Sequence, residues 1–263
     1  MTQSELFDLS GKVALVTGAG AGMGRAICEA LAEHGADIAC ADVNGGLAEE
    51  TADLLEPFGN RTLAITADVF DEADIQQMVR STQDGLGQVE IVFAHAAVVD
   101  TTPARIHELS TEDWDQVASR YVRGLFILMK TVLPLMMKGG GGKFITTAAG
   151  TALWPLPQVG NLHLATAYIT GKTAAIMLTK LAARQYGEYG ISANVICPGY
   201  HRTRHHMQDG QAMDDMEQLV LQATPLKRVG LADDIKGLAV YLASEASSFV
   251  TGQVFVEDGG FSA

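Results

Sequence analysis

Short apolar runs alternate with longer segments of helical periodicity along the chain, and this alternation constrains its fold more than any other feature. Residues 13–16 form a continuous apolar run rich in β-branched residues, which is typical of a strand buried on both faces. A glycine-rich turn follows, then a segment at 25–34 whose apolar residues share one helical face, then a second apolar run at 38–41. This order predicts two parallel strands joined by a right-handed crossover helix.

The same alternation continues to the C-terminus. Further strands are predicted at 62–66, 91–94, 144–147, 192–196 and 253–256, and further helices at 46–56, 73–82, 111–137, 167–186 and 232–242. No linker rich in Pro, Gly or Ser separates two halves. We therefore predict an α/β fold: a single doubly wound Rossmann-like domain over 1–263, with a seven-stranded parallel sheet and helices on both faces. Ligands bind beyond the carboxyl ends of the strands in such sheets.

Two segments, 151–165 and 199–223, do not fit the alternation. Both follow predicted strand ends, and long loops in compact domains are usually functional. We expect these two segments to be loops that define the substrate site.

Composition excludes several classes of protein. The 18 basic and 31 acidic residues give a net charge of −13, which disfavours a nucleic-acid or anionic-membrane partner. Cys28, Cys40 and Cys197 lack the spacing of a disulfide framework or zinc site. Residues 1–12 show neither a basic region nor an apolar run, so no signal peptide is expected. These features favour a cytoplasmic protein with a small-molecule substrate.

The turn at 17–24, TGAGAGMG, lies between the first strand and the first helix. Glycines there permit a tight turn and let the backbone approach a pyrophosphate, whose charge is met by the helix N-terminus. Such a turn could be merely flexible. Its position between strand and helix favours dinucleotide binding.

Asp42 ends the second predicted strand. A carboxylate there accepts hydrogen bonds from the adenosine ribose hydroxyls and repels a 2′-phosphate, and no basic residue follows until Arg61. The expected cofactor is therefore NAD(H) in preference to NADP(H). Asp42 could also cap the next helix, and the two roles are compatible.

Tyr168 and Lys172 lie four residues apart in a predicted helix, hence on one face. An ammonium beside a phenol favours the phenolate and lowers its pKa from about 10 towards the range of a general base. The alternative is an ordinary pair on the helix surface.

Taken together, the motifs resemble those of the short-chain dehydrogenase/reductase superfamily. They are the glycine turn, Asp68-Val69, Tyr168 with Lys172, Pro198-Gly199, and Thr251-Gly252 followed by Asp258-Gly259-Gly260, and they span the chain from about residue 10 to its C-terminus. The resemblance implies a Rossmann-like domain, a nicotinamide cofactor and a homotetramer or dimer.

The resemblance also implies roles for individual residues. Tyr168 is the expected acid/base, Lys172 binds the nicotinamide ribose, and Thr147 takes the place of a serine that binds the substrate oxygen. Asp68 and Val69 are expected to contact the adenine, and Pro198–Thr203 the carboxamide and pyrophosphate end. The implied cofactor contacts are Gly18, Gly22, Met23, Gly24, Asp42, Asp68, Val69, Ala96, Tyr168, Lys172, Pro198, Gly199, His201 and Thr203.

Three positions depart from the family pattern. The NNAG motif is replaced by AHAA at 94–97, where His95 either contacts substrate or takes over the structural hydrogen bonds of an asparagine. Tyr121 stands where an asparagine supports a proton-relay water, and we count it among the catalytic candidates. Thr147 and Tyr168 are also separated by more residues than is usual.

The longer interval contains Leu153, Trp154 and Leu156, which indicate either an apolar wall for a hydrophobic or cyclic substrate or a contact with a neighbouring subunit. Met207 is a further candidate for the substrate lining. The histidines at 163, 201, 205 and 206 lack an evident carboxylate or cysteine to complete a ligand set, so we expect no metal.

The function expected from these residues is NAD(H)-dependent interconversion of a secondary alcohol and a ketone. Two alternatives remain: a non-redox lyase or dehalogenase-type enzyme that uses the tyrosine as base, and a non-catalytic nucleotide-binding or assembly protein.

Overall fold

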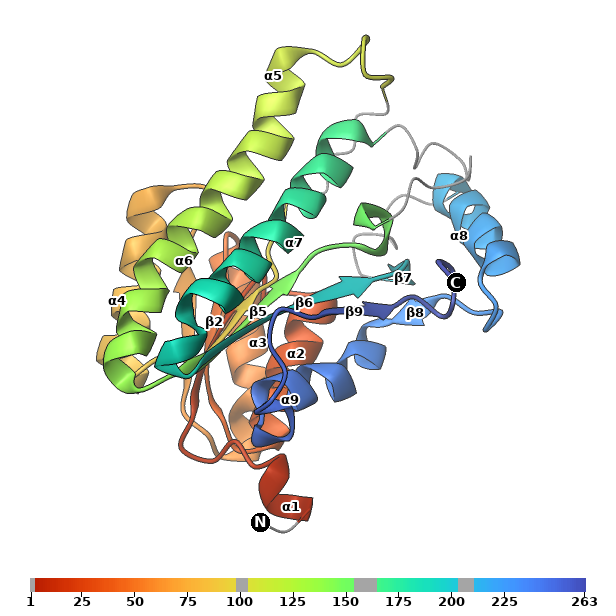
Figure 1. Ribbon diagram of the computed structural model, residues 1–263. Coiled ribbons are helices and arrows are strands. Elements are labelled where there is room, and N and C mark those ends of the chain that lie inside the picture. Colours follow the sequence, from red (N-terminus) through yellow and green to blue (C-terminus); the bar gives the residue numbers. More distant parts are fainter. Residues whose placement is uncertain (1–2, 98–103, 154–164, 203–210) are drawn as a thin grey trace.

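The computed structural model describes residues 3–97, 104–153, 165–202 and 211–263 (Figure 1). Its centre is a seven-stranded parallel sheet in the order β3-β2-β1-β4-β5-β6-β9, which confirms the predicted fold class. The strands are β1 (Val13–Thr17), β2 (Asp37–Asp42), β3 (Thr62–Thr66), β4 (Ile91–Ala94), β5 (Gly142–Thr147), β6 (Ile191–Pro198) and β9 (Val254–Glu257). The strand order reverses between β1 and β4, and ligands of doubly wound sheets bind at this switch point.

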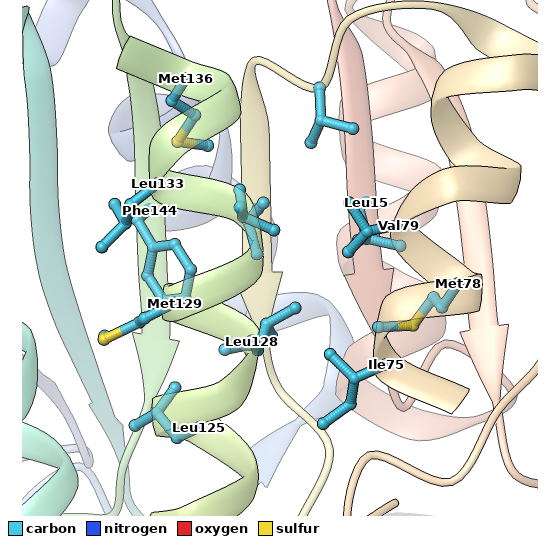
Figure 2. Packing of buried hydrophobic residues seen from close by; sticks show 14 of the residues in the cluster. Leu15, Ile75, Met78, Val79, Leu125, Leu128, Met129, Leu133, Met136 and Phe144 are labelled. Atoms are coloured by element: carbon cyan, nitrogen blue, oxygen red, sulfur yellow. The ribbon is translucent and has the colours of Figure 1, made fainter. Parts of the chain in front are cut away.

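Helices cover both faces of the sheet because the central strands are apolar on both sides. In β1, Val13 and Leu15 pack towards one face, and Ala14 and Val16 pack towards the other. The first face is covered by α4 (Glu72–Leu86), α6 (Arg120–Gly139) and α7 (Thr166–Tyr186), and the second by α2 (Gly22–Glu33), α3 (Gly45–Leu55) and α9 (Lys236–Ala243). Figure 2 shows Leu15 beside Met78 and Val79 of α4.

Three predicted helices differ from those observed. The first begins at Gly22, inside the glycine turn, rather than at residue 25. The helix predicted over 111–137 consists of α5 (Thr111–Trp114), a π-helical turn (Asp115–Ser119) and α6. Apolar periodicity misses such a turn because one additional residue leaves the helix continuous. The helix predicted over 232–242 is a 3-10 turn (Ala232–Ile235) followed by α9.

The segment 199–223 is only partly a loop, contrary to the prediction. His201–Arg202 forms β7, which pairs in parallel with β8 (Gly230–Leu231), and Gln211–Ala223 forms α8. A short helix, α1 (Gln3–Leu6), precedes the sheet. Among the described helices, none is both long and apolar enough to cross a membrane.

Candidate active site

A cavity of about 1500 Å³ opens at the carboxyl ends of the strands. It is formed by the turn after β1, the ends of β2, β4, β5, β6 and β9, and the start of α7. The fold thus brings together residues that are far apart in the sequence. The predicted site residues that line it are Gly18, Gly22, Met23, Asp42, Asp68, Val69, His95, Ala96, Thr147, Tyr168, Lys172, Pro198, Gly199 and His201.

The glycine turn has the shape that a pyrophosphate requires. Gly18 and Gly22 have φ angles of 70° and 56°, in the left-handed region that favours glycine. A Cβ on Gly24 would lie 1.9 Å from the Gly18 carbonyl oxygen, so this position acts from behind the turn rather than from the cavity wall. Ala21, before α2, provides no side-chain cap for the first N–H groups of the helix. Uncapped N–H groups at a helix N-terminus bind anions, so the turn fits a dinucleotide.

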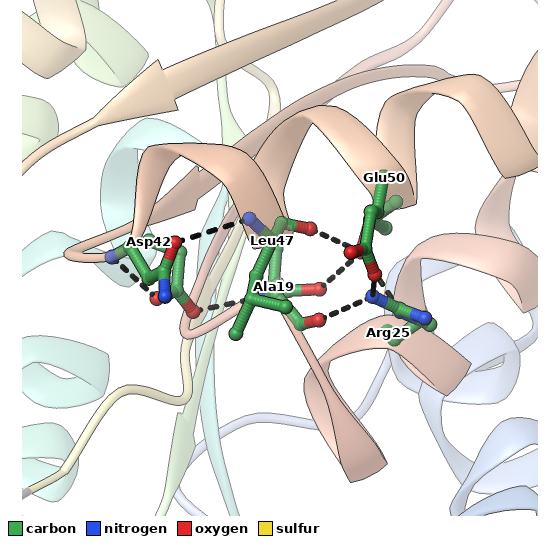
Figure 3. Close-up of polar contacts among 8 residues, drawn as sticks. Ala19, Arg25, Asp42, Leu47 and Glu50 are labelled. Carbon is green, nitrogen blue, oxygen red and sulfur yellow. Dashed lines mark hydrogen bonds and ion pairs between the residues drawn. The ribbon is translucent and has the colours of Figure 1, made fainter.

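Asp42 is held at the end of β2 by two backbone donors (Figure 3). Its Oδ2 accepts from the Gly20 N–H and its Oδ1 from the Asn44 N–H, each at 2.9 Å. The predicted capping role belongs instead to Asn44, whose Oδ1 accepts from the Leu47 N–H. Asp42 therefore remains available at the cavity wall.

The basic group near the turn, Arg25, has several partners. It donates to the Gly20 carbonyl at 2.6 Å and to the Thr51 hydroxyl at 3.0 Å, and it forms an ion pair with Glu50 at 3.2 Å (Figure 3). Its charge is thus balanced by a carboxylate beside it, which makes it a weak candidate for binding a 2′-phosphate.

His95 joins the end of β4 to the end of β5. Its backbone N–H donates to the Thr17 hydroxyl, and its Nδ1 lies 3.1 Å from the Thr147 hydroxyl oxygen. Desolvation, with smaller effects of the nearby Lys172 and His201, lowers the pKa of His95 to about 4. The imidazole is therefore neutral near pH 7 and can fix the orientation of the Thr147 hydroxyl.

Lys172 is fully enclosed, with 2% of its surface exposed. Its Nζ donates to the Tyr121 hydroxyl at 3.0 Å and to the Thr147 carbonyl oxygen at 2.9 Å. Burial lowers the pKa of Lys172 to about 7 and raises the pKa of Tyr121 above its ordinary value. Tyr121 lies outside the cavity lining and contacts Lys172 from behind.

Tyr168 lines the cavity, at the start of α7. The Lys172 Nζ lies 5.8 Å from the centre of its ring. Desolvation, followed by the effect of Cys197, raises the pKa of Tyr168 to about 12. The expected lowering of this pKa is therefore wrong, because desolvation of the phenol decides the direction. Lys172 donates to Tyr121 and Thr147 instead. A protonated phenol facing a cavity can exchange a proton with a bound ligand.

The sequence reasoning missed the surroundings of His201. Its Nε2 lies 2.9 Å from the Glu257 Oε2, and the Asp234 carboxylate is also close. The expectation that no carboxylate accompanies the histidines is thus wrong for His201. Arg228 donates to both oxygens of Asp234, so the group is a set of ion pairs. Glu257 could have been noticed as a charge that ends an otherwise apolar strand.

Some predicted residues lie outside the described ranges. They are Trp154 and Met207 of the substrate candidates, Thr203 of the cofactor candidates, and the histidines at 163, 205 and 206. Conversely, Val220, Leu226 and Phe261 line the cavity although no sequence motif singled them out.

The chain is similar to known proteins over nearly its whole length. A family model described as enoyl-(acyl carrier protein) reductase matches residues 18–262. The 2-dehydro-3-deoxy-D-gluconate 5-dehydrogenase of Dickeya dadantii is 34% identical, and the match covers 97% of each chain.

Two solved structures share the fold over nearly the whole length. A short-chain type dehydrogenase/reductase from Mycobacterium marinum has a TM-score of 0.89 and 32% identity, with 98% of each chain covered. A 7α-hydroxysteroid dehydrogenase complexed with NADH and 7-oxoglycochenodeoxycholic acid has a TM-score of 0.88 and 30% identity, covering 99% of this chain and 98% of that one.

Proposed function

The chain belongs to the short-chain dehydrogenase/reductase family, and on that premise we propose that it is an NAD(H)-dependent oxidoreductase interconverting a secondary alcohol and a ketone. The observation that carries this proposal is that Tyr168 lines the same cavity as the glycine turn and Asp42. One cavity thus combines groups for dinucleotide binding and for proton transfer.

The shape of the turn and the charge at the end of β2 support the proposed cofactor. The N-terminus of α2 at Gly22 and Met23 would bind the pyrophosphate, and Asp42 the adenosine ribose. Asp68 and Val69 would border the adenine, Lys172 would bind the nicotinamide ribose, and Pro198, Gly199, His201 and the Ala96 backbone would border the nicotinamide. When bound, the nicotinamide supplies or accepts the hydride.

Asp42 also favours NAD(H) over NADP(H). A carboxylate with both oxygens fixed beside the turn repels a 2′-phosphate, and Glu50 balances the nearby Arg25. The relative solved with NADH shows that a similar chain accepts this dinucleotide.

The chain's own residues perform the proton chemistry. In reduction the Tyr168 hydroxyl gives its proton to the ketone oxygen and becomes a phenolate, and in oxidation the phenolate takes the proton of the alcohol. Thr147, held by His95, would hydrogen-bond the same substrate oxygen. Lys172, anchored by Tyr121 and the Thr147 carbonyl, would place a positive charge near the phenolate.

We propose a hydrophobic or cyclic alcohol as substrate. Val220, Leu226 and Phe261 give part of the cavity an apolar wall. A similar solved structure holds a 7-oxo compound together with NADH, which is consistent with a cyclic ketone.

A second copy of the chain is the proposed partner. Large apolar side chains are exposed on the two helices that pack against each other, namely Phe126 of α6 and Met177 and Leu181 of α7. A pair of such faces is suited to burial between subunits of a tetramer or dimer. Light scattering coupled to gel filtration would test this, and a monomer at all concentrations would contradict it.

The enzymatic proposal is tested by incubating the protein with NAD⁺ or NADP⁺ and a panel of cyclic and open-chain secondary alcohols. We expect NADH absorbance to appear with at least one cyclic alcohol, and faster than NADPH absorbance. If the protein binds NADH tightly but no alcohol of the panel reduces NAD⁺ or NADP⁺, the result would instead favour the non-redox lyase or dehalogenase-type alternative.

A further inference from the structure

A buried ion pair lies at one end of the cavity, outside the groups used above for proton transfer. His201, 3% exposed, faces Glu257 with 2.9 Å between Nε2 and Oε2. Both atoms are buried, and apart from this mutual contact neither has a hydrogen-bond partner among the described residues. The other ring nitrogen, Nδ1, lies 3.1 Å from the Gly199 carbonyl oxygen.

This pair fastens the backbone that follows β6. The Gly199 N–H donates to the Glu257 carbonyl oxygen, and β7 pairs with β8 through His201 and Gly230. Gly230 packs flat against the imidazole, since a Cβ there would lie 2.5–2.8 Å from ring atoms. The His201 side chain is therefore enclosed between β8, β9 and its own strand, and its position sets the path of 199–202 along the cavity wall.

Charged groups surround the pair from each neighbouring element. Asp234, after β8, contributes a second negative charge, and Arg228 neutralises it through two hydrogen bonds. Arg202 is paired with Glu217 of α8, and His95 lines the same cavity as His201. Glu257 is thus the direct charge partner of His201.

We propose that His201 and Glu257 are positioning residues: their ion pair fixes 199–202 at the nicotinamide end of the cavity while His201 carries a proton, and loss of that proton weakens dinucleotide binding. This inference rests on the proposed function, because it concerns the same cofactor. Neither residue needs to touch the reacting atoms.

The direction of the pH effect follows from the electrostatics. Burial lowers the pKa of His201, but the hydrogen bond and charge of Glu257, with smaller contributions from Gly199 and Asp234, raise it above the ordinary value overall. The interaction is therefore complete below the ordinary pKa of about 6.5 and is lost as the pH rises through the higher value in the folded protein. Deprotonation leaves Glu257 as a largely enclosed carboxylate without its cation, which is unfavourable.

The experiment measures the NADH dissociation constant by fluorescence between about pH 6 and pH 9. The wild type and the double variant His201→Val/Glu257→Val are compared. Both retain the effect of Lys172, whose pKa near 7 also lies in this range. We expect the dissociation constant to rise about tenfold more in the wild type than in the double variant over that interval. His34→Gln is the matched control at a histidine outside the cavity lining, and it should retain the wild-type profile.

Glu257→Gln is the second variant, since it keeps the side-chain volume and removes only the charge; circular dichroism verifies that each variant folds. Glu257→Gln should also reduce the pH dependence of the NADH dissociation constant. The proposal is overturned if the NADH dissociation constant depends on pH equally in the wild type and in Glu257→Gln. It is also overturned if EDTA changes the pH dependence of the wild type, because His201, Asp234 and Glu257 would then hold a cation. If the wild type binds no NADH at any pH, the proposed function fails as well. If the wild type binds NADH and the variants show the same pH dependence of binding, only the positioning role of His201 and Glu257 is contradicted.

Discussion

The Nζ of Lys172 lies 3.0 Å from the phenolic oxygen of Tyr121, and both groups donate to the carbonyl oxygen of Thr147. A buried ammonium is thus held by a phenol and by a backbone carbonyl. The arrangement joins α7, α6 and β5 directly behind the cavity. We expect it to keep Lys172 in place beside Tyr168.

Tyr121→Phe removes one partner of a buried charge. Leaving such a donor without its acceptor costs about 1–3 kcal/mol, so we expect a lower melting temperature and kcat reduced by about tenfold. Steady-state kinetics and thermal melts provide the measurements. Tyr189→Phe, at an exposed tyrosine, is the control. A Tyr121→Phe enzyme with the melting temperature and the kcat of the wild type would show that the phenol does not support Lys172.

Lys172→Met should alter stability in a pH-dependent way. The pKa of Lys172 in the folded protein, about 7, is below its ordinary value of 10.5, so the unfolded chain binds more protons between these two values. The wild type therefore gains stability as pH rises through this window, and the variant lacks that gain. The melting temperature of the variant relative to wild type should be higher at about pH 6 than at about pH 9. Lys180→Met, at an exposed lysine, is the control. If Lys172→Met and the wild type differ in melting temperature by the same amount at both pH values, the lowered pKa of Lys172 is contradicted.

Asp42→Ala should weaken NAD⁺ binding by about tenfold and reduce discrimination against NADP⁺, because the ribose loses its acceptor and the 2′-phosphate loses its repulsion. The ratio of kcat/KM values for the two dinucleotides is the measurement. Asp37→Ala, at the opposite end of the same strand, removes a carboxylate that pairs with Arg61 and should leave the ratio unchanged. An unchanged ratio in Asp42→Ala would remove this residue from the ribose site.

His95→Asn should make the protein less sensitive to acid. Because the pKa of His95 is lowered to about 4 in the folded state, the unfolded chain binds more protons between that value and 6.5, and stability falls as pH falls through this window. Urea unfolding at about pH 7 and about pH 4.5 would show a smaller loss for the variant than for wild type. The exposed His107→Asn serves as control. If the variant loses as much unfolding free energy as the wild type on acidification, His95 is not a neutral group with a lowered pKa.

The sequence predicted the sheet because each central strand carries its own evidence: Ala14 and Val16 are apolar like Val13 and Leu15, which requires burial on both faces. The glycine turn and Asp42 were predicted for the same reason, since their chemistry depends on local order along the chain. The His201–Glu257 pair was missed because its members are 56 residues apart on different strands, and nothing local links them. The raised pKa of Tyr168 was missed because it depends on how deeply the phenol is buried, which spacing along a helix does not determine.

The most direct test of the proposed function is the turnover of Tyr168→Phe with the best alcohol of the panel. The variant keeps the ring and the cavity wall but has no proton to exchange, and general acid–base catalysis of this kind contributes about 10²–10⁴-fold. We predict a loss of turnover in that range while the NADH dissociation constant stays within about threefold of wild type. Turnover near that of the wild type would contradict the assignment of Tyr168 as the acid/base and, with it, the central claim.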